Sequence, residues 1–230
     1  AQQRAVTKAD YITRVYALPA KYGNIAKCYI VQDSQLDAGT GAANSDSRII
    51  NPLALNLYTL GFDANKNLTQ INQENIQTYL TQFRMVTDAV NIKDAFVINI
   101  AVKFNILTKV GYNADDVVLR AIQKVKSFFE IDKWQIGQPI ILSDLAYQLS
   151  LVDGVSAVVA PEENNPNGQP ILIGNKAIAS QGYSGNIYDI AAATVDGIVY
   201  PSLDPSCFEL KFPTTDIEGR SVGSSAAGGN

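Results

Sequence analysis

The chain contains few of the side chains on which common catalytic mechanisms depend. It has no histidine and two cysteines, Cys28 and Cys207, which lie far apart and form no Cys-x-x-Cys motif. Without imidazole, neither a histidine-activated serine or cysteine nucleophile nor a histidine-containing zinc site can be built. The cysteine spacing offers no metal knuckle or redox pair. We therefore expect free thiols in a reducing compartment.

Carboxylates and one glycine-containing stretch are the remaining candidates for chemistry. Three aspartates share a polar stretch: Asp33, Asp37 and Asp46. They lack the alternate spacing and the final bidentate glutamate of a calcium loop, so a solvated acidic loop explains them better. The adjacent Asp115 and Asp116 favour a helix N-terminus through the helix dipole. The stretch GTGAANS lacks the Gly-Lys-Ser/Thr ending of a phosphate loop. We expect no catalytic residue, no metal site and no cofactor, although carboxylate pairs can still assemble in space.

The composition indicates a globular protein. Of its 230 residues, 47% are hydrophobic and 17% are charged, which is enough to bury a core. The net charge is −4, and the 18 basic residues are scattered singly, which disfavours a nucleic-acid partner. No apolar run approaches the roughly 18 residues of a membrane span. The chain starts at Ala1 and its one methionine is Met85, so we expect a processed product or a piece of a longer chain.

Four segments carry the signals of a helix start, which are an N-cap residue and flanking apolar residues. The predicted caps are Thr7, Asn72, Asn113 and Ser143. The predicted helices span residues 7–18, 73–84, 114–129 and 144–151. The apolar face of the third helix is expected at Val118, Ile122, Val125 and Phe129.

Short apolar or alternating runs predict strands between these helices, at residues 24–32, 52–60, 86–92, 95–107 and 154–160. The clearest is 95–107, where alternate residues from Phe96 to Ile106 are apolar and Asn99, Lys103 and Asn105 face the other way. Residues 34–47 are typical of a mobile loop. This order predicts an α+β fold with two small tandem units, residues 1–93 and 94–160, the second a split β-α-α-β unit with both helices on one face of its sheet.

From Pro161 onward the chain is rich in turn residues and short apolar runs. We expect hairpins and extended docking arms over 161–220, and a disordered tail over 221–230. Five aromatic residues crowd this segment: Tyr183, Tyr188, Tyr200, Phe208 and Phe212. Two interpretations remain open, namely local packing within hairpins and anchors of a protein–protein interface.

Three blocks of sequence resemble baseplate proteins of contractile phage tails. The block RAVTKADYITRVYALPAKYGNIAKCYI, from Arg4 to Ile30, resembles the opening motif of the baseplate J-like family. Two more are similar to stretches of T-even-type baseplate wedge proteins: YLTQFRMVTDAVNIKDAFVINIAVKFNI, from Tyr79 to Ile106, and IVYPSLDPSCFELKFPTTDIEG, from Ile198 to Gly219.

The resemblance implies a structural subunit without enzymatic activity. Such a subunit would dimerise and join other wedge proteins into an inner ring around the tail hub, in the baseplate of a virion assembled in the bacterial host cytoplasm. Two alternatives from other classes stay open. One is a tail-associated hydrolase that uses paired carboxylates, and the other is a ligand-binding module with a deep apolar pocket.

Overall fold

The chain folds as two units, one formed by Ala1–Phe96 with Ser202–Ser206 and the other by Val97–Pro201 with Cys207–Asn230. The computed structural model describes residues 4–19, 25–32, 54–61, 70–84, 89–130, 133–162, 165, 167–202 and 205–224. Both units combine helices with mixed sheets, which confirms the predicted α+β class. In these described ranges, no helix has the length and apolar character needed to cross a bilayer.

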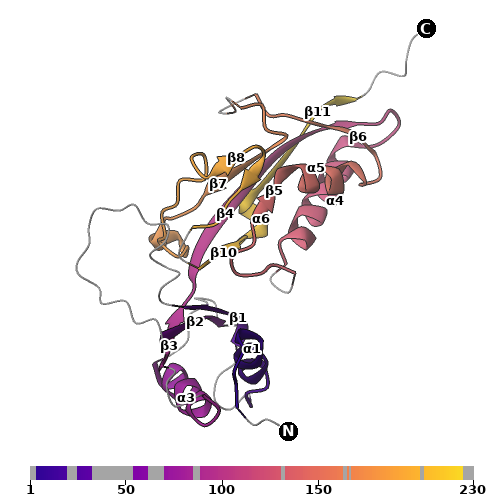
Figure 1. Ribbon diagram of the computed structural model, residues 1–230. Helices are drawn as coiled ribbons and strands as arrows, with labels where there is room; N and C mark the ends of the chain where they lie inside the picture. The colour runs from indigo at the N-terminus through magenta and orange to yellow at the C-terminus, as the bar shows by residue number, and fades with distance from the viewer. Residues whose placement is uncertain are drawn as a thin grey trace. The chain divides into compact units, whose positions relative to one another are not determined.

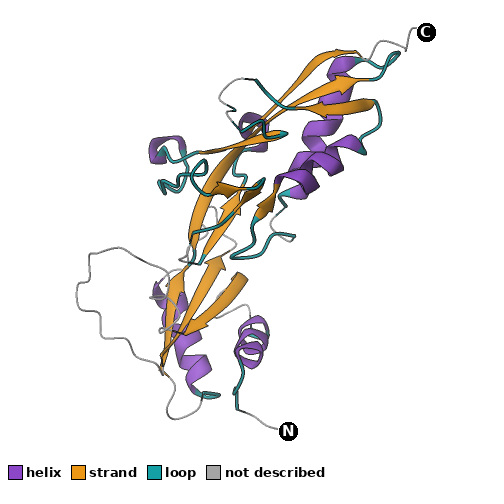
Figure 2. Ribbon diagram, turned by 45° about the horizontal axis from the view of Figure 1, so that its top comes forward, coloured by secondary structure: helices purple, strands orange, loops and turns teal. Residues whose placement is uncertain are grey.

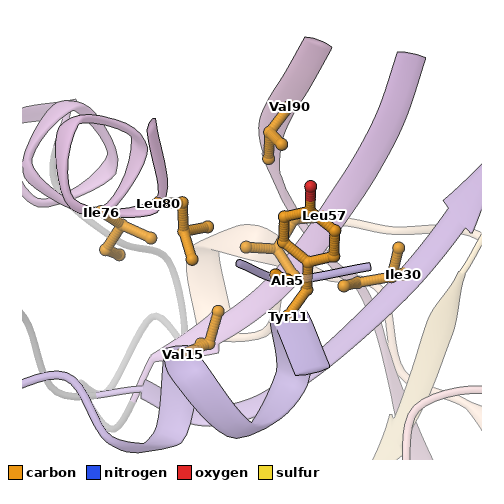
Figure 3. Close-up of a cluster of buried hydrophobic side chains, with 8 residues drawn as sticks. All are labelled: Ala5, Tyr11, Val15, Ile30, Leu57, Ile76, Leu80 and Val90. Atoms are coloured by element: carbon orange, nitrogen blue, oxygen red, sulfur yellow. The ribbon is translucent and has the colours of Figure 1, made fainter. Parts of the chain in front are cut away.

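The first unit packs two helices against a small sheet (Figure 1). Its elements in chain order are α1 (Lys8–Tyr16), β1 (Ile25–Gln32), β2 (Ala54–Gly61), α3 (Gln70–Thr81) and β3 (Ala89–Asp94). The strand order is β1-β2-β3, with β1 antiparallel and β3 parallel to β2. Helix α1 contacts β1, and α3 contacts β3. Figure 3 shows the buried cluster that joins these elements: Ala5, Tyr11, Val15, Ile30, Leu57, Ile76, Leu80 and Val90.

Two of the predicted caps are confirmed. The Thr7 hydroxyl accepts a hydrogen bond of 3.2 Å from the Asp10 backbone N–H, and the Asp10 carboxylate accepts one of 2.8 Å from the Thr7 N–H. Asn113 caps α4 (Ala114–Phe128) by accepting a 2.9 Å hydrogen bond from the backbone of Asp115. Side-chain capping of this kind, which is reciprocal between Thr7 and Asp10, satisfies backbone donors that the first helical turn leaves free.

The predicted caps at Asn72 and Ser143 are wrong. Asn72 lies inside α3, which begins at Gln70. Helix α5 (Leu142–Ser150) begins one residue before Ser143 and has no side-chain cap. Here the short strand β5 (Ile140–Ile141) leads directly into the helix, and the Leu142 N–H donates to the backbone carbonyl of Gly197 over 3.0 Å. A tertiary backbone contact thus replaces the local cap.

The second unit is built around one long strand, β4 (Phe96–Thr108), as Figure 2 shows. Strand β11 (Ile217–Ser224) pairs with β4 in parallel. Strands β6 (Val155–Val159) and β7 (Ile171–Asn175) pair with β4 in the antiparallel direction. The fifth strand is β10 (Ser206–Glu209). The alternation of apolar residues predicted for β4 is confirmed, because Ile98, Ile100, Val102, Phe104 and Ile106 are all buried.

Helices α4 and α5 cover one face of this sheet, α4 over β11 and α5 over β6 and β7. The buried stripe of α4 is Val117, Ala121, Val125 and the following Phe129. The predicted Val118 and Ile122 are only half-buried and flank this stripe. Hydrophobicity alone underestimates a small residue such as Ala121, which lies at the centre of the contact face.

Residues after Pro161 contribute strands to the sheet of β4, which differs from the separate docking segment expected over 161–220. Strands β7, β10 and β11 all belong to it. A strand as long as β4 needs backbone partners along its length, and pairing between segments distant in sequence leaves no local signal.

The segment after Pro161 also contains four short elements: η2 (Ala179–Gln181), β8 (Thr194–Val195), β9 (Ile198–Val199) and α6 (Pro213–Asp216). Strands β8 and β9 form a small sheet with β5, in the order β5-β9-β8. Within the expected tail, residues 221–224 belong to β11. Residues 225–230 and the expected mobile loop at 34–47 lie outside the described residues.

Candidate docking surface

A loop between β7 and β8 is fastened to the start of β4 by asparagine and serine side chains. The Asn99 side chain is 0% exposed. Its Oδ1 accepts a hydrogen bond of 2.7 Å from the Ser184 N–H, and its Nδ2 donates a hydrogen bond of 2.8 Å to Glu209 Oε2. The Asn186 side chain donates 2.7 Å to the Val97 carbonyl. The Asn186 contact satisfies a backbone carbonyl of β4, and the Asn99 side chain links that strand to the loop and to β10. The sequence correctly places Asn99 on the polar face of β4, but the loop covers that face here.

The fastened loop presents apolar side chains outward. Ile187 is 84% exposed, the highest value among the large hydrophobic residues of the described ranges, and Ile178 is 54% exposed. Asn175 holds the backbone next to Ile187, because its Oδ1 accepts 3.1 Å from the Tyr188 N–H. Sequence analysis missed these residues. The feature of the sequence that could have indicated this exposure is a single Ile that follows Gly185 and Asn186, residues that cannot bury it.

The five aromatic residues predicted as interface anchors do not share one environment. Phe208 is 3% exposed, and its ring centroid lies 6.3 Å from that of Tyr188. The Tyr188 hydroxyl donates a hydrogen bond of 2.7 Å to the backbone carbonyl of Tyr200. The Tyr183 and Phe212 rings meet edge to face at 5.3 Å. The five residues therefore form two ring pairs, Tyr188 with Phe208 and Tyr183 with Phe212, and Tyr200 is joined to the first pair through its carbonyl. Phe208 lies in the interior.

Exposure separates the aromatic residues that can touch a partner from those that support the fold. Tyr200 is 48% exposed and Phe212 is 38% exposed, whereas Tyr183 and Tyr188 are half-buried. Burial raises the pKa of both half-buried tyrosines, and the bond to Asp216 raises that of Tyr183 further. Both hydroxyls therefore stay protonated at neutral pH and act as hydrogen-bond donors.

The thiols and acidic residues singled out in the sequence have structural environments. Burial raises the pKa of Cys28 to about 11, and Cys207 is 3% exposed, so neither is an activated nucleophile. Asp115 and Asp116 lie in the first turn of α4, as predicted. Among the described residues, no three His, Cys, Asp or Glu side chains gather as a metal site. Asp33, Asp37 and Asp46 lie outside the described residues.

A groove of about 610 Å³ crosses β4, β6, β7 and β11. It contains Glu218, whose Oε2 lies 2.9 Å from Lys103 Nζ and whose Oε1 lies 2.7 Å from Arg220 Nη2. The hydrogen bond from Lys103 is the main cause that lowers the pKa of Glu218, and Arg220 contributes to the same shift. A glycosidase-type general acid needs a raised pKa. Glu218 therefore serves as the centre of a surface ion-pair network and not as a proton donor.

Comparison with known proteins finds similarity in fold alone. No protein-family model matches the sequence, and no curated protein matches it. Among solved structures, the fold is similar to a chain in the cryo-electron microscopy structure of the anti-feeding prophage baseplate, 6-fold symmetrised, with a TM-score of 0.57 and 10% sequence identity. The match covers 91% of this chain but 38% of that chain. Both units of this chain thus have a counterpart within a longer baseplate component.

Proposed function

We propose that this chain is a non-enzymatic structural subunit of a contractile-tail baseplate. The observation that carries the proposal is the fold similarity over 91% of the chain to a component of the anti-feeding prophage baseplate. The three sequence blocks that resemble contractile-tail baseplate proteins support the same class. They include residues of α1 and β1 in the first unit and of β4, β10 and α6 in the second.

The more specific role that we propose is that of a wedge component. In this role the chain dimerises, contacts other wedge proteins and contributes to an inner ring around the tail hub. Its location is the baseplate of a virion that is assembled in the bacterial host cytoplasm. The exposed apolar side chains of the second unit support this role, because an assembly subunit leaves contact residues open until its partners bind.

The exposed aromatic residues refine the candidate interface. Tyr200 and Phe212 are open to a partner, whereas Phe208 is interior. The Tyr183 hydroxyl donates to the Asp216 carboxylate and the Tyr188 hydroxyl donates to the Tyr200 carbonyl, so both side chains hold neighbouring segments in place. We therefore assign direct contacts to Tyr200 and Phe212, and a supporting role to the other three.

The decisive experiment is localisation in assembled particles. The chain, tagged at one end, is expressed in the organism that encodes it, and tail particles are purified by density gradient and imaged by cryo-electron microscopy. We expect the chain in the particles, with density for its two units in the baseplate. Particles that lack the chain, or that carry it only in the tail tube or sheath, would overturn the proposal.

A further inference from the structure

We infer that the pocket between η2 and α6 receives an acidic side chain of a partner baseplate subunit, and that an apolar neighbour of this acidic residue packs on Phe212. The inference rests on the proposed function and deepens it, because it names the chemistry of the partner segment at one docking surface. Three observations carry it: a pocket with a fixed aromatic wall, a lysine in that pocket without an ion pair, and backbone donors that are already engaged.

Three segments that are distant in the chain form the pocket. One is the residue after β7, the second is η2 with the loop that follows it, and the third is α6 with the residue before it. The volume is about 420 Å³, which falls within the roughly 300–1,000 Å³ typical of ligand sites. The lining residues include Lys176, Gln181, Tyr183, Phe212, Thr214 and Asp216.

The Phe212 ring forms an apolar wall of this pocket and is held in place. It is 38% exposed, and it meets the Tyr183 ring edge to face at a centroid distance of 5.3 Å. Gly182 brings the backbone close to the same ring, because a Cβ atom there would lie 3.3 Å from Cζ of Phe212. An exposed aromatic side chain that is fixed in advance loses little conformational entropy when a partner covers it.

The pocket offers a positive charge that lacks a counter-ion. The Lys176 side chain is half-buried, and within the described ranges its ammonium group has no ion pair. Asp216 also lines the pocket, but it is 2% exposed. Both of its oxygens already accept hydrogen bonds, one from the Tyr183 hydroxyl and one from the Phe212 N–H. Because charges removed from water are usually paired, a carboxylate from outside the chain is the complementary group for Lys176.

The backbone of the pocket favours an acidic side chain over a terminal carboxylate or a phosphate. Proteins capture those two groups with several free backbone N–H groups. Here the Phe212 N–H donates to Asp216, and the N–H groups of Thr215 and Asp216 donate to the Phe212 carbonyl. The Lys176 N–H donates to the Asn99 carbonyl over 2.9 Å. With these donors engaged, recognition of the anion depends on the Lys176 side chain.

The partner segment therefore combines an acidic residue with an apolar residue beside it. The apolar side chain covers Phe212, as anchors do at the centre of protein interfaces. By excluding water, this contact strengthens the attraction between the carboxylate and Lys176. The Gln181 and Thr214 side chains, which are exposed, can donate hydrogen bonds to the second carboxylate oxygen.

The test measures binding of four short peptides to the full chain by two-dimensional NMR. The first peptide is acetyl-Ala-Phe-Glu-Ala-amide, the second has Gln in place of Glu, and the third has Ala in place of Phe. The fourth, acetyl-Ala-Phe-Gln, carries its carboxylate at a free C-terminus instead of on a side chain. Together they separate the acidic group, the apolar group and the source of the carboxylate.

Variants of the chain test the pocket itself. Lys176→Gln removes the positive charge. Gln181→Glu, at an exposed position, places a carboxylate of the chain beside Lys176 and keeps the test decisive if Lys176→Gln does not fold. Lys124→Gln is the matched control, since Lys124 is a half-buried lysine of the same unit that also has no ion pair among the described residues. The NMR spectra show whether each variant is folded.

We expect the Phe-Glu peptide to bind with a Kd of about 1 mM or below and to shift the amide signals of Gln181, Thr214 and Thr215. The other three peptides should bind at least about fivefold more weakly, since each lacks a charged hydrogen-bond partner or an apolar anchor in the right place. Lys176→Gln and Gln181→Glu should lose the preference for Glu over Gln, and Lys124→Gln should keep it.

Three results would overturn the inference: no binding of the Phe-Glu peptide at about 5 mM, binding of another peptide that is as tight or tighter, or a preference for Glu that survives in the folded pocket variants. If this happens while tail particles contain the chain, the proposed function stands and the inference alone fails. If the particles lack the chain, the proposed function fails, and the peptides still decide whether the pocket binds a side-chain carboxylate.

Discussion

The hydroxyl of Tyr183 donates a hydrogen bond of 2.6 Å to Oδ1 of Asp216, a carboxylate that is 2% exposed. The other carboxylate oxygen of Asp216, Oδ2, accepts a hydrogen bond of 2.9 Å from the Phe212 N–H. One buried carboxylate thus links the loop after η2 to α6, although Tyr183 and Asp216 lie 33 residues apart in the chain.

We predict that Tyr183→Phe lowers the free energy of unfolding by about 1–3 kcal/mol, because a buried acceptor loses its donor. Urea denaturation monitored by circular dichroism measures the change. Tyr200→Phe is the matched control, since that residue is 48% exposed and should change stability little. Equal effects of the two substitutions would contradict the role assigned to Asp216.

The Asp10 carboxyl should titrate at an unusually low pH. Hydrogen bonds from the backbone of Thr7 and Val6 lower its pKa below the ordinary value of 3.8. Because the fold favours the ionised form, the stability that Asp10 contributes is complete above the unfolded pKa and is lost as the pH falls through the folded pKa. A carbon-detected NMR titration of the Asp10 side chain should give a midpoint below 3.8. A midpoint at or above this value would argue against the capping box.

Gly219→Ala should destabilise the second unit by about 1–3 kcal/mol, the usual cost of overpacking a core. A Cβ atom at Gly219 would lie 2.5 Å from Cζ of Phe104, whose ring is 1% exposed. Gly174, in β7 on the same sheet, has no atom within 4 Å of the same added Cβ. Thermal unfolding of both variants checks the contrast, which fails if Gly174→Ala is as harmful as Gly219→Ala.

Asn99→Ala should loosen the loop that carries Ile187. The Ser184 N–H and Glu209 lose their partner at Asn99, and each lost buried hydrogen bond typically costs about 1–3 kcal/mol. Hydrogen exchange should show faster exchange of the Ser184 amide. Asn105→Ala, at a half-buried position on the same face of β4, should leave that amide protected. Unchanged exchange in Asn99→Ala would mean that other contacts hold the loop.

Tyr200→Ala should impair assembly into tail particles more than it impairs folding. The side chain is 48% exposed, so its removal leaves little interior space, whereas an interface loses an aromatic anchor. Quantification of the chain in purified particles, beside its melting temperature, separates the two effects. Phe208→Ala should show the reverse, because that residue is 3% exposed. Tyr29→Ala, 43% exposed in β1 of the first unit, is the control.

Local signals in the sequence predicted the elements well but not their long-range partners. Thr7 and Asn113 cap their helices because each cap depends on backbone groups two or three residues away. Ser143 fails as a cap because Gly197, distant in sequence, already accepts from the backbone at Leu142. The alternation in β4 predicted its buried face, yet nothing local shows that β11 pairs with it. The exposure of Ile187 was not predicted either, because the backbone on both sides of it is held by hydrogen bonds of the Asn175 and Asn186 side chains.

The parallel pairing of β11 with β4 has a consequence during translation. Val102 in β4 leaves the ribosome long before Ile217, its partner in β11. During that interval the nascent chain holds α4 and α5 without the strand on which α4 packs. The second unit therefore reaches its native state only when β11 has emerged. Ribosomes stalled before residue 217 should carry a second unit that is digested by protease.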